Sequence, residues 1–364
     1  MMRQECITRL CAVAAACALV AASIPAITQA APSASASSTP LMNVLDRFTA
    51  SDVPALGPAE IAVSRSRNTN AVVGVNLPGK GLAQHPMPII GEGLNIIFLV
   101  NDGKVIWTYQ TGGGWEYDDI WMLSNGNILF TRMQYIAVVT PKKEVIWRYD
   151  APSGTEIHGC QPIGQDKVFF VQNGLPPKVI IANIKTKEIV MQHDLPCQSL
   201  TNKGTVHAQF RRIRYTAQET YLVPFLSMNK VVEYDKNWKE VWRYDIRAPW
   251  AAIRLKNGNP LITDESENLT REVNPKKETV WEFSNTDLPV EYRFLSAPQS
   301  CTRLANGNTI FCSRGNGKGP QMVEVTPDKK VVWVMQDYRT FGPVSAVQVL
   351  DDPGIPESPG ESEH

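Results

Sequence analysis

The sequence has no excess of charge of either sign, because its 364 residues contain 36 lysines and arginines and 36 aspartates and glutamates. Such a balance gives no electrostatic footprint for nucleic acid, so we expect no nucleic-acid partner. The sequence also has no Cys-x-x-Cys or His-x-x-x-His spacing, no phosphate-binding loop and no heptad run. Spacing therefore predicts no metal site and no cofactor, although a calcium ion held by Asp and backbone oxygens would leave no such signature.

Long apolar runs are absent after the first thirty residues. The N-terminal run LCAVAAACALVAASIPAI follows a basic start and ends in small residues near Ala30, which is typical of a cleaved secretory signal over residues 1–30. A lipoprotein signal at Cys17 is the alternative. We therefore expect a periplasmic or secreted protein with no membrane span in its mature chain.

A repeated pair of motifs organises the rest of the chain. The first motif contains Asn-Gly, which suits a two-residue type I′ hairpin, and occurs as LSNGNILF (123–130), LKNGNPLI (255–262) and LANGNTIF (304–311). The second motif ends in Trp and occurs as VTPKKEVIW (139–147), VNPKKETVW (273–281) and VTPDKKVVW (325–333). The runs between turns are rich in Val, Ile and aromatic residues, as strands are. Self-similarity at a period of about 40–50 residues predicts repeated supersecondary units.

Counting the motifs predicts an all-β, six-bladed β-propeller of four-stranded blades. The expected outer strands end at Trp107, Trp147, Met191, Trp242, Trp281 and Trp333. The expected inner strands are 117–123, 156–163, 207–213, 249–255 and 297–304, with Pro343–Leu350 closing the ring against the N-terminal strands. We expect the repeated Trp to pack between neighbouring blades. The segment 58–85 leaves a seventh blade open.

The same motifs divide the chain. We expect a linker over 31–57, the propeller over 58–350 and an acidic tail over 351–364. No feature predicts self-association, so we expect a monomer.

The unit L-x-N-G-N followed by V-x-P-x-x-x-V-x-W resembles the blades of the quinoprotein-like and arylsulfotransferase-like propellers, a group of exported bacterial proteins with PQQ-like repeats. The resemblance covers residues 86–350 and lies in structural positions, so it implies the fold more than an activity. Quinone-binding members hold their cofactor with adjacent cysteines, and the absence of such a pair here argues against a quinone. Arylsulfotransferases use a channel histidine, to which His158 and His207 are comparable.

Propellers generally bind ligands at one mouth of the central channel, where first strands begin and second strands end. Polar residues here differ from blade to blade at those positions, whereas structural residues of a repeat should recur. The candidates for acid–base catalysis are His158, His207, Asp118 and Glu156. The candidates for ligand binding are Glu116, Tyr117, Arg132, Gln134, Gln172, Asn173, Gln209, Trp250, Asp264, Gln299 and Arg314. The alternative is that each His bonds neighbouring backbone and each Arg forms an ion pair within the fold.

The cysteines allow one geometric prediction. With Asn306 and Gly307 as the two turn residues, Cys301 lies opposite Cys312 on antiparallel strands, and directly opposed cysteines can form a disulfide. A Cys160–Cys197 bond is a weaker alternative.

The function that these patterns favour is binding of a polar or anionic small molecule, a saccharide above all, at the channel mouth. The alternatives are a glycan-active hydrolase or lyase that uses the same pocket, an arylsulfotransferase-like enzyme, and a scaffold for protein partners.

Overall fold

The computed structural model describes residues 41–48, 77–92, 94–112, 116–290, 293, 296–315 and 319–364, all of which belong to one compact unit. The predicted signal peptide and most of the segment 58–85 lie outside the described residues. In the part of the chain that is described, no helix has the length and apolarity needed to cross a bilayer.

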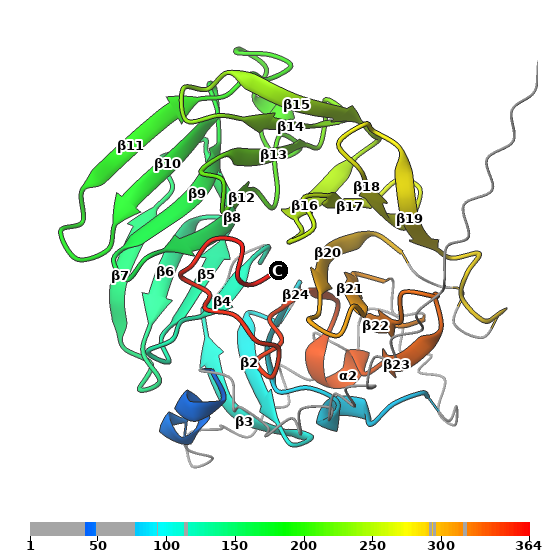
Figure 1. Cartoon of the computed structure of the whole chain (residues 1–364). Helices are drawn as coiled ribbons and strands as arrows, with labels where there is room; N and C mark the ends of the chain where they lie inside the picture. Colours follow the sequence, from blue (N-terminus) through cyan, green and yellow to red (C-terminus); the bar gives the residue numbers. More distant parts are fainter. Residues whose placement is uncertain are drawn as a thin grey trace, which may run out of the picture. The chain divides into compact units, whose positions relative to one another are not determined.

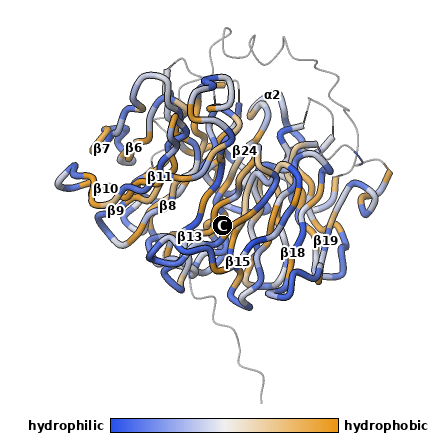
Figure 2. The backbone as a smooth tube through the Cα atoms, turned by 90° about the horizontal axis from the view of Figure 1, so that it is seen from above, coloured by the Kyte–Doolittle hydropathy of each residue, from blue (hydrophilic) through white to orange (hydrophobic). Residues whose placement is uncertain are grey.

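The described strands form six four-stranded antiparallel sheets around a central axis (Figure 1). Each sheet is one blade, with its first strand near the axis and its fourth strand at the outside of the ring. Figure 2 shows hydrophobic stretches within the strands and hydrophilic stretches toward the loops. The prediction of an all-β, six-bladed propeller is confirmed.

The bounds of the elements are as follows. Blade 1 contains β24 (Val344–Val347), β1 (Met87–Gly91), β2 (Ile96–Asn101) and β3 (Lys104–Gln110). Blade 2 contains β4 (Ile120–Met122), β5 (Ile128–Arg132), β6 (Tyr135–Val139) and β7 (Val145–Asp150). Blade 3 contains β8 (Glu156–Ile163), β9 (Lys167–Asn173), β10 (Lys178–Asn183) and β11 (Ile189–Asp194). Blade 4 contains β12 (Arg214–Tyr215), β13 (Tyr221–Phe225), β14 (Lys230–Tyr234) and β15 (Glu240–Asp245). Blade 5 contains β16 (Pro249–Arg254), β17 (Pro260–Asp264), β18 (Leu269–Val273) and β19 (Thr279–Ser284). Blade 6 contains β20 (Pro298–Arg303), β21 (Thr309–Ser313), β22 (Met322–Val325) and β23 (Val331–Met335). The described helices are η1 (Met42–Arg47), η3 (Gly81–Ala83), η4 (Lys203–Thr205) and α2 (Tyr338–Phe341).

The ring is closed by strands from opposite ends of the described chain. β24 pairs with β1, with Ile89 opposite Val347 and Ile90 opposite Ala346. The predicted closing strand is therefore confirmed. Because β24 completes the first blade, the described strands leave no open sheet edge inside the ring.

Two of the repeated Trp residues join their blade to the next through the second motif. The indole Nε1 of Trp107 donates a hydrogen bond to the main-chain oxygen of Pro141 over 2.8 Å, and Nε1 of Trp281 does the same to Pro327 over 3.0 Å. Both prolines belong to the V-x-P turn of the following blade. The conserved spacing of Trp and Pro within the repeat thus produces a contact between blades, as expected.

Blade 3 lacks this Trp, and blade 4 supplies an aromatic side chain instead. Met191 occupies the usual Trp position on β11. Trp238, in the turn between β14 and β15, stacks on His193 of β11 with ring centroids 4.0 Å apart and on Tyr221 with centroids 4.2 Å apart. At this interface the tryptophan therefore comes from the following blade, blade 4, and packs on the outer strand of blade 3.

The Asn-Gly hairpins differ from the type I′ turns predicted from the sequence. In the hairpin of blade 6, Leu304 N bonds Asn308 O, Gly307 N bonds Leu304 O, and Gly307 takes a φ of 89°. Asn306 is not among the residues with positive φ, which a type I′ turn requires. The turn therefore contains three residues and ends in a glycine bulge, which moves the register by one residue.

This register makes the predicted disulfide wrong. Cys301 lies opposite Phe311, and Cys312 lies opposite Ser300. A shift of one residue places the two side chains on opposite faces of the sheet. Cys301 packs in the core between blades 5 and 6, and Cys312 packs in the core shared with blade 1. Both are free, as are Cys160 and Cys197.

Two segments outside the predicted propeller pack against it. Part of the expected linker forms η1, whose Val44 and Leu45 are buried in the core around Trp107. The acidic segment 351–364 runs from the end of blade 1 across one end of the ring, and the last residue drawn lies near the axis (Figure 1). His364 is buried there, with 1% of its surface exposed.

Candidate functional site

The inner strands carry irregularities at equivalent positions near one mouth of the channel. The pairing of β8 with β9 shifts between Ile157 and Cys160, and the pairings of β16 with β17 and of β20 with β21 shift likewise. These shifts leave His158, Trp250 and Gln299 outside the regular register. A β-bulge re-aims a side chain and is common beside functional sites.

Blades 2 and 4 supply residues at the same level. Asp119 N bonds Thr131 Oγ1 just as Ala251 N bonds Thr263 Oγ1, so Asp118 is equivalent to Trp250. Arg212 bridges to Ala251, which makes Arg211 equivalent as well. Five blades thus contribute one buried residue each, and no residue type recurs. These residues are Asp118, His158, Arg211, Trp250 and Gln299.

Backbone approach between blades 3 and 4 depends on a glycine. A Cβ atom at Gly159 would lie 2.4 Å from the main-chain oxygen of Arg211. Only glycine permits this contact. The absence of a side chain at Gly159 therefore allows His158 and Arg211 to reach the same region.

His158 is fully buried and lies between two carboxylates. Its Nδ1 is 2.8 Å from Asp118 Oδ2, and its Nε2 is 3.1 Å from Glu156 Oε2. Asp118 is 2% exposed, whereas the Glu156 side chain is 20% exposed. The ring is therefore oriented by a buried carboxylate on one side and faces a more accessible carboxylate on the other.

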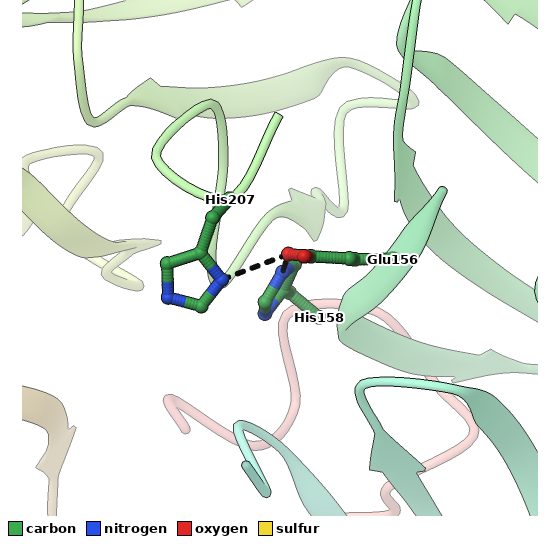
Figure 3. Close-up of side chains that lie close together, drawn as sticks. All are labelled: Glu156, His158 and His207. Carbon is green, nitrogen blue, oxygen red and sulfur yellow. Dashed lines mark hydrogen bonds and ion pairs between the residues drawn. The ribbon is translucent and has the colours of Figure 1, made fainter. Parts of the chain in front are cut away.

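His207 has the same arrangement but is half-exposed. Its Nδ1 is 2.9 Å from Glu156 Oε2, and its Nε2 is 3.1 Å from Glu116 Oε1. Figure 3 shows the Glu156 carboxylate close to both imidazole rings, whose centroids are 5.7 Å apart. Glu156 thus connects two histidines that lie 49 residues apart in sequence.

Arg211 lies beside Glu116 and Asp118, two of the three carboxylates of the cluster. Its Nη2 is 3.6 Å from Glu116 Oε2 and 3.1 Å from His207 Nε2, and its Nε is 3.5 Å from Asp118 Oδ1. The guanidinium also covers the Trp250 ring at 4.5 Å. Arg211 therefore offsets part of the negative charge and fixes the position of Trp250.

The contacts shift the pKa values of the exposed members of the cluster. Hydrogen bonds with Glu116 and Glu156 raise the pKa of His207 to about 10, although burial opposes the shift. Burial would raise the pKa of Glu116, but the His207 hydrogen bond and the Arg211 charge lower it to about 2. The pKa of Glu156 is also about 2, because hydrogen bonds with His158 and His207 outweigh burial. With this pKa, His207 is protonated at neutral pH, and its charge offsets part of the charge of Glu116 and Glu156.

A polar pocket lies between blades 5 and 6 at the same mouth of the channel. Its volume is about 460 Å³, and its charged lining residues are Glu265 and Arg314. Arg314 Nε is 2.9 Å from Glu92 Oε2, and the Arg314 side chain is 42% exposed. Burial raises the pKa of Glu265, while the nearby Arg211 charge opposes that rise. The pocket and the cluster therefore share an electrostatic environment.

Two sets of three side chains place their potential ligand atoms within 4.8 Å of one another. These sets are Glu156, His158 and His207, and Glu116, Asp118 and His158. Sequence spacing gave no indication of either, because the two histidines belong to different blades. Closure of the ring brings them together.

Several predicted binding residues lie in structural bonds instead. Gln209 bonds both Gly174 N and Gly174 O over 2.9 Å. The Arg132 guanidinium covers the Tyr117 ring at 4.3 Å and bonds Thr111. The other residues whose side chains have local partners are Gln172, Asn173 and Asp264, whereas Gln134 is exposed and only its main-chain oxygen accepts a bond, from Ala151 N. For this group the alternative interpretation, local hydrogen bonding within the fold, describes the structure.

The structure also adds residues that the sequence did not single out for the site. Glu92 directly follows β1, the second strand of blade 1. Burial raises the pKa of Glu92, the charge of Arg314 opposes that rise, and the charges of Glu116 and Asp118 add to it. Arg211 lies three residues before β12, the inner strand of blade 4. Its position before an inner strand was a usable signal, and so was the position of Glu92 at the end of a second strand.

The fold and this cluster define a six-bladed propeller with an ionisable centre at one mouth. No protein-family model matches the sequence, and no curated protein matches it. Among solved structures, a protein of unknown function from Bacteroides caccae is similar, with 24% identity, 72% of this chain and 97% of that chain covered, and a TM-score of 0.65.

Two lyases are similar at a lower level. A streptogramin B lyase shares 16% identity, with 72% of this chain and 85% of that chain covered and a TM-score of 0.50. A catalytically inactive virginiamycin B lyase from Staphylococcus aureus, solved with quinupristin, shares 15% identity, with 72% and 87% covered and a TM-score of 0.50. These likenesses show the propeller fold alone.

Proposed function

We propose that this protein is an exported propeller that binds a polar small molecule, specifically a saccharide carrying an anionic group, at the channel mouth. The observation that supports this proposal is the convergence of non-repeating ionisable side chains from several blades beside a 460 Å³ pocket. Small-molecule sites commonly occupy about 300–1,000 Å³ and contain a few convergent polar groups.

The chemistry of the mouth suits such a ligand. Carboxylates of Glu116 and Glu156 accept hydrogen bonds from hydroxyl groups, and both are partly accessible. The half-exposed Arg314 can bind an anionic group through two parallel hydrogen bonds. The Arg211 guanidinium covers one face of the Trp250 ring, so a ligand cannot stack on that face.

Export and group membership are parts of the proposal that rest on sequence features. The N-terminal run over residues 1–30 supports export, and the paired turn and Trp motifs support kinship with the quinoprotein-like and arylsulfotransferase-like propellers. We propose no quinone, because the chain has no adjacent cysteines.

The test is a calorimetric titration with glucuronate and with glucose as charged and neutral probes. Arg314→Ala should weaken glucuronate binding by about 10- to 100-fold, since a hydrogen bond to a charged group is lost. The matched control is Arg148→Ala, because the Arg148 side chain is 45% exposed and also pairs with an acidic residue, on the outer strand β7. Equal binding by both variants, or no binding of either sugar at millimolar concentration, would contradict the proposal.

A second candidate function is acid–base catalysis on a glycan, as a hydrolase or lyase. The arrangement of His207 favours it, because this half-exposed imidazole contacts two carboxylates, Glu116 and Glu156. In an enzyme, His207→Asn should remove turnover and leave sugar affinity largely unchanged. Retained turnover would exclude His207 from the reaction, and unchanged binding in every mouth variant would favour a protein scaffold.

A further inference from the structure

The two histidines of the cluster share an unusual arrangement of partners. In each imidazole, both ring nitrogens lie close to a carboxylate. The carboxylates are Asp118 and Glu156 for His158, and Glu116 and Glu156 for His207. Glu156 is the partner that they share, so one carboxylate oxygen faces two ring nitrogens (Figure 3).

We propose that Glu156, His158 and His207 bind one divalent transition-metal ion. Two histidines and one carboxylate on one side of an ion, with other positions open, form a known coordination pattern for such metals. The proposed ligand atoms are Nε2 of His158, Nδ1 of His207 and a carboxylate oxygen of Glu156.

The separations of these atoms suit a single ion. Glu156 Oε2 is 3.1 Å from His158 Nε2 and 2.9 Å from His207 Nδ1, and the atoms of this set all lie within 4.8 Å. Adjacent ligands of an octahedral ion at about 2.1 Å are about 3.0 Å apart. Hydrogen bonds have similar lengths, so the orientation of the rings must decide between the two.

The remaining ring nitrogens provide that evidence. A histidine that binds a metal usually donates its other N–H to a carboxylate, which fixes the tautomer and the ring orientation. With its Nε2 on the ion, His158 donates from Nδ1 to Asp118 over 2.8 Å. With its Nδ1 on the ion, His207 has an N–H at Nε2 for Glu116, 3.1 Å away. Both second carboxylates are already in place.

Charge and donor type indicate the class of ion. Three carboxylates and the Arg211 guanidinium give this group a net charge of −2 when the histidines are neutral, which matches a dication. Two imidazole ligands favour a transition metal, because calcium and magnesium prefer oxygen ligands. His207 is half-exposed and faces the mouth, so an ion here would have positions open to a ligand oxygen.

The metal proposal holds whether or not a saccharide binds, and it is tested with metal alone. Calorimetric titration of the tag-free protein with Zn²⁺ should give one site per chain, and Ca²⁺ should not compete. His207→Asn should weaken Zn²⁺ binding by more than the about 10- to 100-fold that an outer hydrogen bond contributes. The matched control, His193→Asn, should bind as the unaltered protein does, because His193 lies on the outer strand β11.

Two further variants separate ligand residues from positioning residues. Glu156→Gln removes a proposed ligand, whereas Glu116→Gln removes only the outer partner of His207, so the second variant should retain weaker binding in the about 10- to 100-fold range. Circular dichroism and unfolding curves would show that each variant folds. Undetectable Zn²⁺ binding, or equal affinity in the His207 and His193 variants, would overturn the proposal.

Discussion

Nε2 of His364 lies 3.1 Å from Nη2 of Arg212 in the interior of the ring. Both side chains are about 1% exposed. Asp119 accepts a hydrogen bond from Arg212 over 2.9 Å, and the main-chain oxygen of His364 accepts one from Arg214 Nε over 2.7 Å. Burial and the two guanidinium charges lower the pKa of His364 well below its usual value, so this imidazole is neutral. Hydrogen bonds of His364 therefore hold the end of the segment 351–364 in the interior of the ring.

Other contacts spread this segment under several blades. Glu357 accepts a hydrogen bond from Ser124 N over 2.8 Å, Gly164 N bonds Glu357 O over 2.8 Å, and Arg303 N bonds Glu363 O over 3.0 Å. These partners belong to blades 2, 3 and 6. The acidic segment thus stabilises the ring on the side opposite to the first-strand entrances.

We predict that His364→Ala lowers the free energy of unfolding by about 1–3 kcal/mol, because buried donors and acceptors lose their partner. Urea unfolding followed by tryptophan fluorescence measures the change. Glu361→Ala, at an exposed position of the same segment, is the control and should cost about 0.5 kcal/mol or less. Equal stability of the two variants would show that the segment does not fasten the ring.

Gly159→Ala should destabilise the interface between blades 3 and 4. The added Cβ would lie 2.4 Å from Arg211 O and 2.8 Å from Arg212 Cα, both backbone atoms that cannot rotate away. We expect a loss of about 1–3 kcal/mol in the free energy of unfolding. Gly204→Ala is the control, since its Cβ would meet only the Asn202 side chain at 3.2 Å. An unchanged unfolding midpoint for Gly159→Ala would contradict the close approach.

Stability should fall with rising pH through His85. Burial would lower the pKa of His85, but hydrogen bonds with Asp351 and Glu324 raise it from 6.5 to about 9. Because the folded value lies above the unfolded value, this contribution is complete below about pH 6.5 and is lost as the pH passes about 9. The difference in unfolding free energy between the unaltered protein and His85→Gln should shrink by up to about 3 kcal/mol between about pH 6 and pH 9.5.

A constant difference across that range would contradict the two His85 ion pairs. Unfolding curves at several pH values for both proteins provide the measurement, and the variant itself controls for all other titrating groups.

The thiols should react in an order set by burial. Cys197 is half-buried, whereas burial raises the pKa of Cys301 to about 12 and that of Cys312 to about 11. Alkylation of the folded, non-reduced protein should therefore label Cys197 first, and Cys301 and Cys312 only after unfolding. Peptide mass mapping would identify the labelled sites. A Cys301–Cys312 bond in the non-reduced peptides would show that the register described above is wrong.

Much of the fold was predictable because equivalent residues of the repeat make equivalent contacts in different blades. The Trp and Pro of the repeat, such as Trp107 and Pro141, lie where neighbouring blades touch. The strand over Val344–Val347 has the inner-strand pattern but no hairpin after it, which indicated that it pairs with the N-terminal strands. The register was not predictable from Asn306-Gly307, because the same dipeptide fits both a two-residue turn and a three-residue turn with a bulge. The additional residue in the turn shifts the register by one and separates Cys301 from Cys312.

The site was predictable in part for a related reason. Side chains such as His158 and His207 stood out because they break the repeat, and ring closure brings them together. Gln209 also breaks the repeat, yet it bonds the backbone of Gly174. Polarity alone cannot separate these cases. The partners of His364 depend on where a segment without repeat pattern folds back, which no local signal indicates.

The central claim is that Glu156, His158 and His207 form one functional centre at the channel mouth. Anomalous diffraction at the zinc absorption edge, on crystals grown from tag-free protein with Zn²⁺, tests it most directly. We predict a single strong peak flanked by Nε2 of His158, Nδ1 of His207 and the Glu156 carboxylate. Peaks confined to His193 or other surface positions, or separate locations for His158 and His207, would contradict it.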